Sequence, residues 1–336
     1  MGLGDAFWQY ECTFCGRRDR HSHTLQHSLP AATEPPGLSR RLRRGRLVVV
    51  SLAVVLVATS VAAVLTVGTS GTTGLAAPRG YSAGQLIFDD AFTGTSLDSA
   101  HWNTVMGGQG EQTWNSGGLP AGDSAAGTQV HQTYFSPSQV QVNNGLDLIM
   151  VPDTKYASLG YDYRSGVVTS RGKFALKSGY VQIRARMSDA SRGGWPAIWF
   201  IDPNGGGGSQ EIDLQEGGFT LAGAALPTGT PEDNVFVSTY HTPSGSQSGF
   251  SYATPIPMNT GFNTYGMEYD PGHSIKTYFN GRLVGSWTHN ISTTPYEIVI
   301  WNSQASAGAS GFHTTGASPN PSDMSVAEVQ AYALSP

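Results

Sequence analysis

Alternation of apolar and polar residues from about residue 84 onward constrains the fold of this chain more than any other feature. Four segments show it: Val140–Asn143, Gly145–Met150, Tyr180–Met187 and Lys276–Phe279. Turn-forming pairs lie between such segments, as at Asn144-Gly145, Pro271-Gly272 and Asn280-Gly281. No helical period runs for ten residues or more after residue 67. About 250 residues of this kind predict one large antiparallel β-sandwich.

Composition excludes several classes of protein. Only 13% of the residues are charged, against about 25% in ordinary soluble domains. The two cysteines, Cys12 and Cys15, lie close together near the N-terminus, so a disulfide-stapled scaffold is excluded. After residue 46 the chain has 11 basic and 20 acidic residues and no basic run. Nucleic acid is therefore not an expected partner, because phosphate binding needs clustered Lys and Arg.

Residues 47–67 form an uncharged, apolar run of 21 residues that directly follows the basic segment 40–46. A helix of this length spans roughly 30 Å, the thickness of the bilayer core. The basic flank predicts a single-pass membrane helix, with the tail 1–46 in the cytoplasm and the rest outside. Cleavage of a signal segment near Ala76, giving a secreted protein, is the alternative.

The remaining chain divides into a linker and a large domain. Residues 68–83 are rich in Gly, Ser and Thr, which predicts a flexible linker, and residues 84–336 form the β-domain. In the tail, Cys12 and Cys15 with His23 and His27 have zinc-like ligand types, but only seven residues separate the two pairs. That separation is shorter than in finger modules, so a disordered tail is the preferred interpretation.

Three carboxylates stand within six residues at Glu211-Ile-Asp-Leu-Gln-Glu216. Such a cluster is unfavourable on a strand, because like charges repel and each resists burial. In a regular strand Glu211 and Asp213 share one face and Glu216 lies on the other. One inserted residue, a β-bulge, would bring all three to the same face. The carboxyls of Glu211 and Glu216 could then lie about 5–5.5 Å apart, which is the separation of the two catalytic carboxyls in retaining glycosidases.

Here the chain resembles glycoside hydrolase family 16, in its laminarinase-like form with a bulged E-x-D-x-x-E motif. The similarity runs from residue 84 to residue 334. It includes an opening at Leu86–Asp98 and His101–Asn103, strands at Tyr163–Phe174 and Ser178–Met187, a late hairpin at Phe262–Gly272 and Tyr278–Gly281, and a closing strand at Met324–Tyr332. The order and spacing of these segments carry the resemblance.

The resemblance implies a concanavalin-like β-jelly roll with a concave substrate cleft. It implies retaining, endo-acting hydrolysis of β-1,3- or β-1,3/1,4-glucans outside the cell. Glu211 is then the nucleophile, Glu216 the general acid/base and Asp213 the assisting carboxylate. Two alternatives stay open: a non-catalytic glucan-binding module on a membrane anchor, and a transglycosylase that uses the same residues.

Aromatic residues are expected to bind the sugar rings, whose apolar C–H faces stack on them. The candidates are Trp114, Trp195, Trp199 and Trp301, together with Asn302 and His241 at positions where the resemblance implies cleft residues. The resemblance also implies a structural calcium, but Ala327 stands where family members carry an Asp ligand. Because loss of a carboxylate weakens such a site, we expect no cofactor.

Overall fold

The computed structural model describes residues 75–106, 110–113, 131–203, 210–221, 223–306 and 321–334. These residues form two packed β-sheets and contain four short 3-10 turns but no α-helix. The turns are η1 (Ala83–Gln85), η2 (Pro137–Gln139), η3 (Ala157–Leu159) and η4 (Glu232–Asn234). The predicted all-β sandwich is confirmed.

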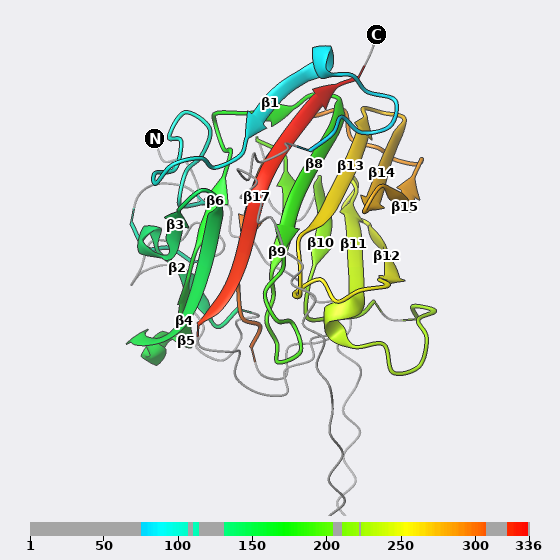
Figure 1. Cartoon of the computed structure of the whole chain (residues 1–336). Coiled ribbons are helices and arrows are strands. Elements are labelled where there is room, and N and C mark those ends of the chain that lie inside the picture. Colours follow the sequence, from blue (N-terminus) through cyan, green and yellow to red (C-terminus); the bar gives the residue numbers. More distant parts are fainter. Residues whose placement is uncertain are drawn as a thin grey trace, which may run out of the picture. The chain divides into compact units, whose positions relative to one another are not determined.

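The larger sheet has ten strands, and the long strand β17 (Ser322–Ala333) lies between β8 and β4 (Figure 1). Its order is β15 (Arg282–Trp287), β14 (Ser274–Phe279), β13 (Asn263–Asp270), β8 (Gly179–Arg186), β17, β4 (Leu146–Tyr156), β5 (Tyr161–Ser165) and β2 (Thr133–Phe135). Two further strands join this sheet: β1 (Leu86–Asp90) pairs with β17, and β3 (Val140–Val142) pairs with β4. All these pairs are antiparallel except β2 with β5.

The smaller sheet has seven strands and carries the three carboxylates. Its order is β12 (Gln247–Ala253), β11 (Val235–His241), β10 (Glu211–Glu216), β9 (Ala197–Ile201), β16 (Tyr296–Trp301) and β6 (Val167–Thr169), while β7 (Ala175–Leu176) pairs with β16. Every pair in this sheet is antiparallel.

The core lies between the two sheets because each strand of the smaller sheet buries every second side chain there. From β9, Ile198 and Phe200 enter the main cluster, and from β10, Ile212 does the same. The intervening residues face away from the larger sheet. Among them, Trp199 and Ala197 belong to a second apolar cluster.

Part of the predicted linker is packed instead of free. The Leu75 amide donates to Glu328 Oε2 at 2.7 Å, and Gln182 Nε2 donates to the Ala76 carbonyl at 3.0 Å. The Tyr81 ring packs against Tyr180, with 5.6 Å between centroids. Composition favoured flexibility, but these contacts with β8 and β17 hold residues 75–85, which we call the N-terminal strap. Residues 75–85 thus belong to the same compact unit as the β-domain.

The predicted membrane span 47–67 and the cysteine tail lie outside the described residues. Within the described residues, no helix is long and apolar enough to cross a membrane.

Candidate active site

Strand β10 places Glu211 and Asp213 on the face of the smaller sheet that turns away from the core. Asp213 lies directly opposite Trp199 on β9 and Thr239 on β11. Glu211 lies opposite His241. Because paired residues in a sheet project on the same side, these side chains share one face. We call it the cleft face, after the substrate cleft that the family resemblance implies.

A β-bulge brings Glu216 to the same face. Asp213 pairs with Trp199, but the next β9 residue, Ile198, pairs with Gln215 instead of Leu214. The extra residue shifts the register, so that Glu216 pairs with Ala197, which lies on the cleft face with Trp199. The predicted bulge is therefore present, and it unites the three carboxylates.

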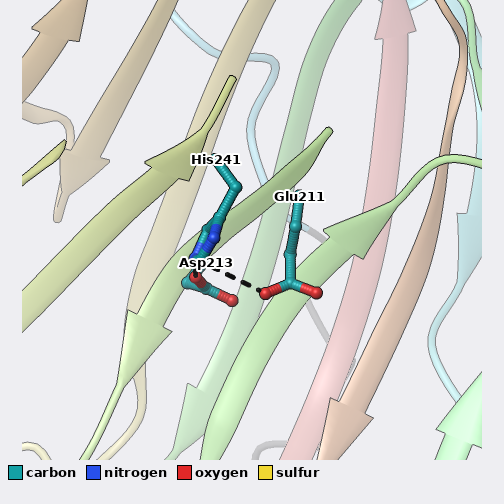
Figure 2. Close-up of side chains that lie close together, drawn as sticks. All are labelled: Glu211, Asp213 and His241. Carbon is teal, nitrogen blue, oxygen red and sulfur yellow. Dashed lines mark ion pairs between the residues drawn. The ribbon is translucent and has the colours of Figure 1, made fainter. Parts of the chain in front are cut away.

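Partners from β11 surround the first two carboxylates. His241 Nε2 lies 3.6 Å from Glu211 Oε1 and 3.4 Å from Asp213 Oδ2. Figure 2 shows the three side chains close together, with these ion pairs dashed. The hydroxyl of Thr239 donates to Asp213 Oδ2. The histidine and the threonine alternate on β11 and so reach the same side.

Glu216 has its own partner in Trp195, which lies just before β9. The indole Nε1 donates to Glu216 Oε1 at 3.1 Å. The chain after Glu216 passes very close to Pro196: the Gly217 amide donates to the Pro196 carbonyl at 2.9 Å. A Cβ at Gly217 would stand only 2.8 Å from Pro196 Cδ, so this approach requires glycine.

Comparison with known families gives this arrangement its context. The sequence model described as Glycosyl hydrolases family 16 matches residues 128–317, more than half of the chain. The chain belongs to glycosyl hydrolase family 16.

Curated relatives of this family 16 chain are named as hydrolases of β-linked polysaccharides, and they include a keratan-sulfate endo-1,4-beta-galactosidase of Sphingobacterium multivorum that is 25% identical over 74% of this chain and 55% of the relative. Endo-1,3-1,4-beta-glycanase ExsH of Rhizobium meliloti (strain 1021) is 26% identical over 215 residues, which cover 60% of this chain and 43% of the relative. Glucan endo-1,3-beta-glucosidase A1 of Niallia circulans is 26% identical, covering 74% and 37% respectively. The Beta-glucanase of Rhodothermus marinus is 28% identical, covering 63% and 68%. The chain thus spans less than half the length of ExsH and of the Niallia circulans enzyme.

Solved structures share the fold. The laminarinase catalytic domain from Thermotoga maritima MSB8 superposes with a TM-score of 0.59 at 21% identity, over 75% of this chain and 99% of the other. An endo-beta-1,3-glucanase from Pyrococcus furiosus gives 0.59 at 20% identity, over 74% and 94%. At these identities the likeness establishes the jelly-roll architecture of the family 16 domain.

Burial and mutual repulsion raise the pKa values of both candidate catalytic glutamates. Burial, and then the charge of Asp213, raise the pKa of Glu211 to about 8, while His241 acts in the opposite direction. Burial, Asp213 and Glu211 raise the pKa of Glu216 well above its usual range, and the bond from Trp195 partly offsets this. A proton on Glu216 at neutral pH is what a general acid needs.

A metal ion would find its best ligand set in the same cluster. Glu211, Asp213 and His241 each offer one ligand atom, and these atoms lie within 4.8 Å of one another. Asp213 already accepts the Thr239 hydroxyl, and both carboxylates already face the imidazole. A metal ion would therefore compete with these contacts for the same oxygen and nitrogen atoms.

Three of the predicted sugar-binding tryptophans come together on the cleft face. Trp195, Trp199 and Trp301 all belong to the second apolar cluster, and the rings of Trp199 and Trp301 lie 5.0 Å apart. The indole N–H groups of Trp199 and Trp301 are buried and have no hydrogen-bond partner among the described residues. Trp114 lies outside the described residues.

Asn302 does not fit its predicted role in binding substrate. Its side chain is completely buried, and its amide donates to the carbonyls of Leu148 and Ser322 at 3.0 and 2.7 Å. Its oxygen accepts the Ser188 hydroxyl at 2.7 Å. These bonds join the end of β16 to β4 and β17, so that Asn302 is structural and offers nothing to a sugar.

Two residues of the site, Thr239 and His131, were not predicted from the sequence. Thr239 is two residues before His241, so strand alternation alone would have placed both on one face. His131 is buried against Trp195, and no local pattern marks it, because its neighbours come from distant parts of the chain.

Proposed function

We propose that this chain is a retaining endo-hydrolase that cleaves internal β-1,3- or β-1,3/1,4-glucan linkages outside the cell. The observation that carries the proposal is the bulge in β10, which presents Glu211, Asp213 and Glu216 on one face of the sheet. Membership of family 16 and the printed activities of the curated relatives support the same substrate class.

The two glutamates divide the work. Glu216, protonated and bonded to Trp195, gives its proton to the leaving oxygen while the ionised form of Glu211 attacks the anomeric carbon. Because the pKa of Glu211 is raised to about 8, we expect activity to rise with pH as this carboxyl loses its proton. The resulting glycosyl ester on Glu211 is hydrolysed by water, with Glu216 taking up the proton of that water. Asp213 accepts the Thr239 hydroxyl and lies beside His241. From this position it helps to orient the groups around the nucleophile.

The location of the protein belongs to the proposal too. The apolar run 47–67, with its basic flank, supports a single-pass anchor that places the catalytic domain outside the cell, where polymeric glucan is found. A cleaved segment and a secreted enzyme would leave the chemistry unchanged.

Reducing-sugar release by residues 73–336 tests the proposal. This fragment keeps the N-terminal strap and is offered laminarin, barley mixed-linkage glucan, agarose, carrageenan and xyloglucan in parallel. We expect release from laminarin or barley glucan, and a loss of at least about 10³-fold in Glu211→Gln, since the amide cannot attack. Asp162→Asn, at an exposed carboxylate, serves as the matched control and keeps full activity.

Outcomes on the five polysaccharides separate the alternatives. Binding to a glucan without any release would refute hydrolysis and favour a binding module. Longer oligosaccharides formed in place of free reducing ends would indicate a transglycosylase. Release that Glu211→Gln leaves unchanged would refute the assignment of the nucleophile.

A further inference from the structure

His131 lies in contact with the residue that holds the candidate acid. Its imidazole stacks on the Trp195 indole, with 4.1 Å between ring centroids and 19° between planes. Trp301 meets both rings edge-on, at 5.1 Å from His131 and 5.7 Å from Trp195. Only 2% of His131 is exposed, so the ring is enclosed in an aromatic box.

Ser303 fixes the histidine and the tryptophan to the same point. Its hydroxyl lies 3.0 Å from His131 Nδ1. Its backbone exchanges two bonds with Trp195, since the Trp195 amide donates to the Ser303 carbonyl at 2.6 Å and the Ser303 amide donates back at 3.2 Å. An isolated bridge joins His131 to Ala305. Hydrogen bonds to Ser303 and the bridge to Ala305 therefore hold the stacked rings of His131 and Trp195 in place.

The orientation of the Trp195 ring matters because its Nε1 donates to Glu216 Oε1. An indole N–H donates in the plane of its ring, so a rotated ring loses the bond. Burial lowers the pKa of His131 to about 3, which leaves the ring neutral at all ordinary pH values. His131 consequently acts by packing and hydrogen bonding, without exchanging a proton.

We infer that His131 is a positioning residue for the acid step: stacked on Trp195 and tied to Ser303, it sets the indole plane that directs Nε1–H to Glu216. The inference rests on the proposed function of Glu216 as general acid. His131 itself has no contact with the reacting atoms in this account.

Comparing two substrates with different leaving groups distinguishes a role in the acid step from a purely structural role, because a structural defect would lower activity on both. Protonation by Glu216 is needed for a sugar leaving group, but a low-pKa phenol leaves without it. The full-length chain is therefore assayed on laminarin and on a 2,4-dinitrophenyl β-oligoglucoside. In His131→Ala we expect kcat/KM on laminarin to fall about 10- to 100-fold, as part of the usual 10²–10⁴-fold acid contribution. On the aryl glycoside we expect less than about a 3-fold change.

Milder variants separate stacking from hydrogen bonding and guard against misfolding. His131→Phe keeps a stacking ring and is expected to recover most of the laminarin activity. Ser303→Ala removes the ring's hydrogen bond but not the stack, and is expected to show a smaller version of the same substrate-dependent loss. His273→Ala, at an exposed histidine on a turn, is the matched control and changes neither activity. Equal losses on both substrates in Ser303→Ala and His131→Ala, or no loss at all, would overturn the inference.

A spectroscopic readout stays informative even without turnover. The Trp195 indole N–H resonance is assigned through Trp195→Phe, and Glu216→Gln is expected to shift it because the two groups are bonded. In the His131→Ala background that shift should disappear. If the parent chain hydrolyses neither substrate, the proposed function fails, and this shift alone decides the role of His131. Persistence of the shift in His131→Ala would overturn that role.

Discussion

The two faces of the smaller sheet differ sharply although they are built from the same strands. On the inner face, Ile198, Phe200 and Ile212 are completely buried against the larger sheet. On the cleft face, the same strands carry Trp199, Asp213 and their neighbours. Adjacent residues of β9 or β10 therefore differ in their effect on stability: one stabilises the fold and the next lowers its stability.

The two faces differ because the cleft face has buried polar groups without hydrogen-bond partners among the described residues and carboxyl groups that repel one another. The cleft face holds buried indole N–H groups without partners at Trp199 and Trp301 and two glutamates with raised pKa values. Each such group lowers stability unless something satisfies it. The inner face thus provides stability, whereas the cleft face keeps polar groups that lower it.

The strongest test of the comparison removes one large side chain from the inner face. Phe200→Ala should lower the free energy of unfolding by about 3–5 kcal/mol, through lost burial and the cavity left behind. Trp199 is the next residue on the same strand and lies on the opposite face; Trp199→Phe removes an unpartnered N–H and should cost less than about 1.5 kcal/mol. Urea unfolding measures both. Similar losses for the two variants would contradict the division between the faces.

Glu211→Gln should raise stability, and only above acidic pH. Below about pH 4.5 the carboxyl is protonated in both the folded and unfolded chain. Between 4.5 and about 8 the unfolded chain ionises while the folded site holds its proton, so the parent loses stability as pH rises. The variant should therefore gain stability over the parent progressively up to about pH 8 and gain nothing at pH 4, as measured by urea unfolding at both values. A gain that shrinks with rising pH would contradict the sign.

The N-terminal strap should contribute to stability but not to chemistry. Tyr81→Ala removes ring contacts with Tyr180 and Tyr332 and should cost about 1–2 kcal/mol of unfolding free energy. Thermal unfolding and kcat/KM on laminarin are measured together. A fall in kcat/KM without a fall in stability would show that the strap acts on the cleft.

The smallest effect is expected at His241. His241, 3.6 Å from Glu211, lowers the pKa of that carboxyl, so its loss should raise the pKa of Glu211. In His241→Gln the rising, acidic limb of the kcat/KM profile should move up by about 0.5–1 pH unit. His289→Gln, at an exposed histidine, should leave the profile in place. Movement toward lower pH would contradict the account.

Local patterns predicted much of this molecule because they act over a few residues. Alternation gave the sandwich, and the spacing of Glu211, Asp213 and Glu216 required the bulge that is found at Leu214. The failures involve long-range contacts. The Leu75 amide of the strap donates to Glu328. The Asn302 side-chain amide donates to the carbonyls of Leu148 and Ser322 and so cannot bind a sugar. Neither set of partners can be inferred from neighbouring sequence.

The central claim is that Glu211 attacks the sugar. A 2-deoxy-2-fluoro β-oligoglucoside with a good leaving group slows hydrolysis of the covalent intermediate, so that the ester accumulates and mass spectrometry of the digested protein locates it. The account predicts one added glycosyl group on the peptide that contains β10, at Glu211, and none in Glu211→Gln. A label on Glu216, or rapid turnover of laminarin with no labelled carboxylate, would contradict it.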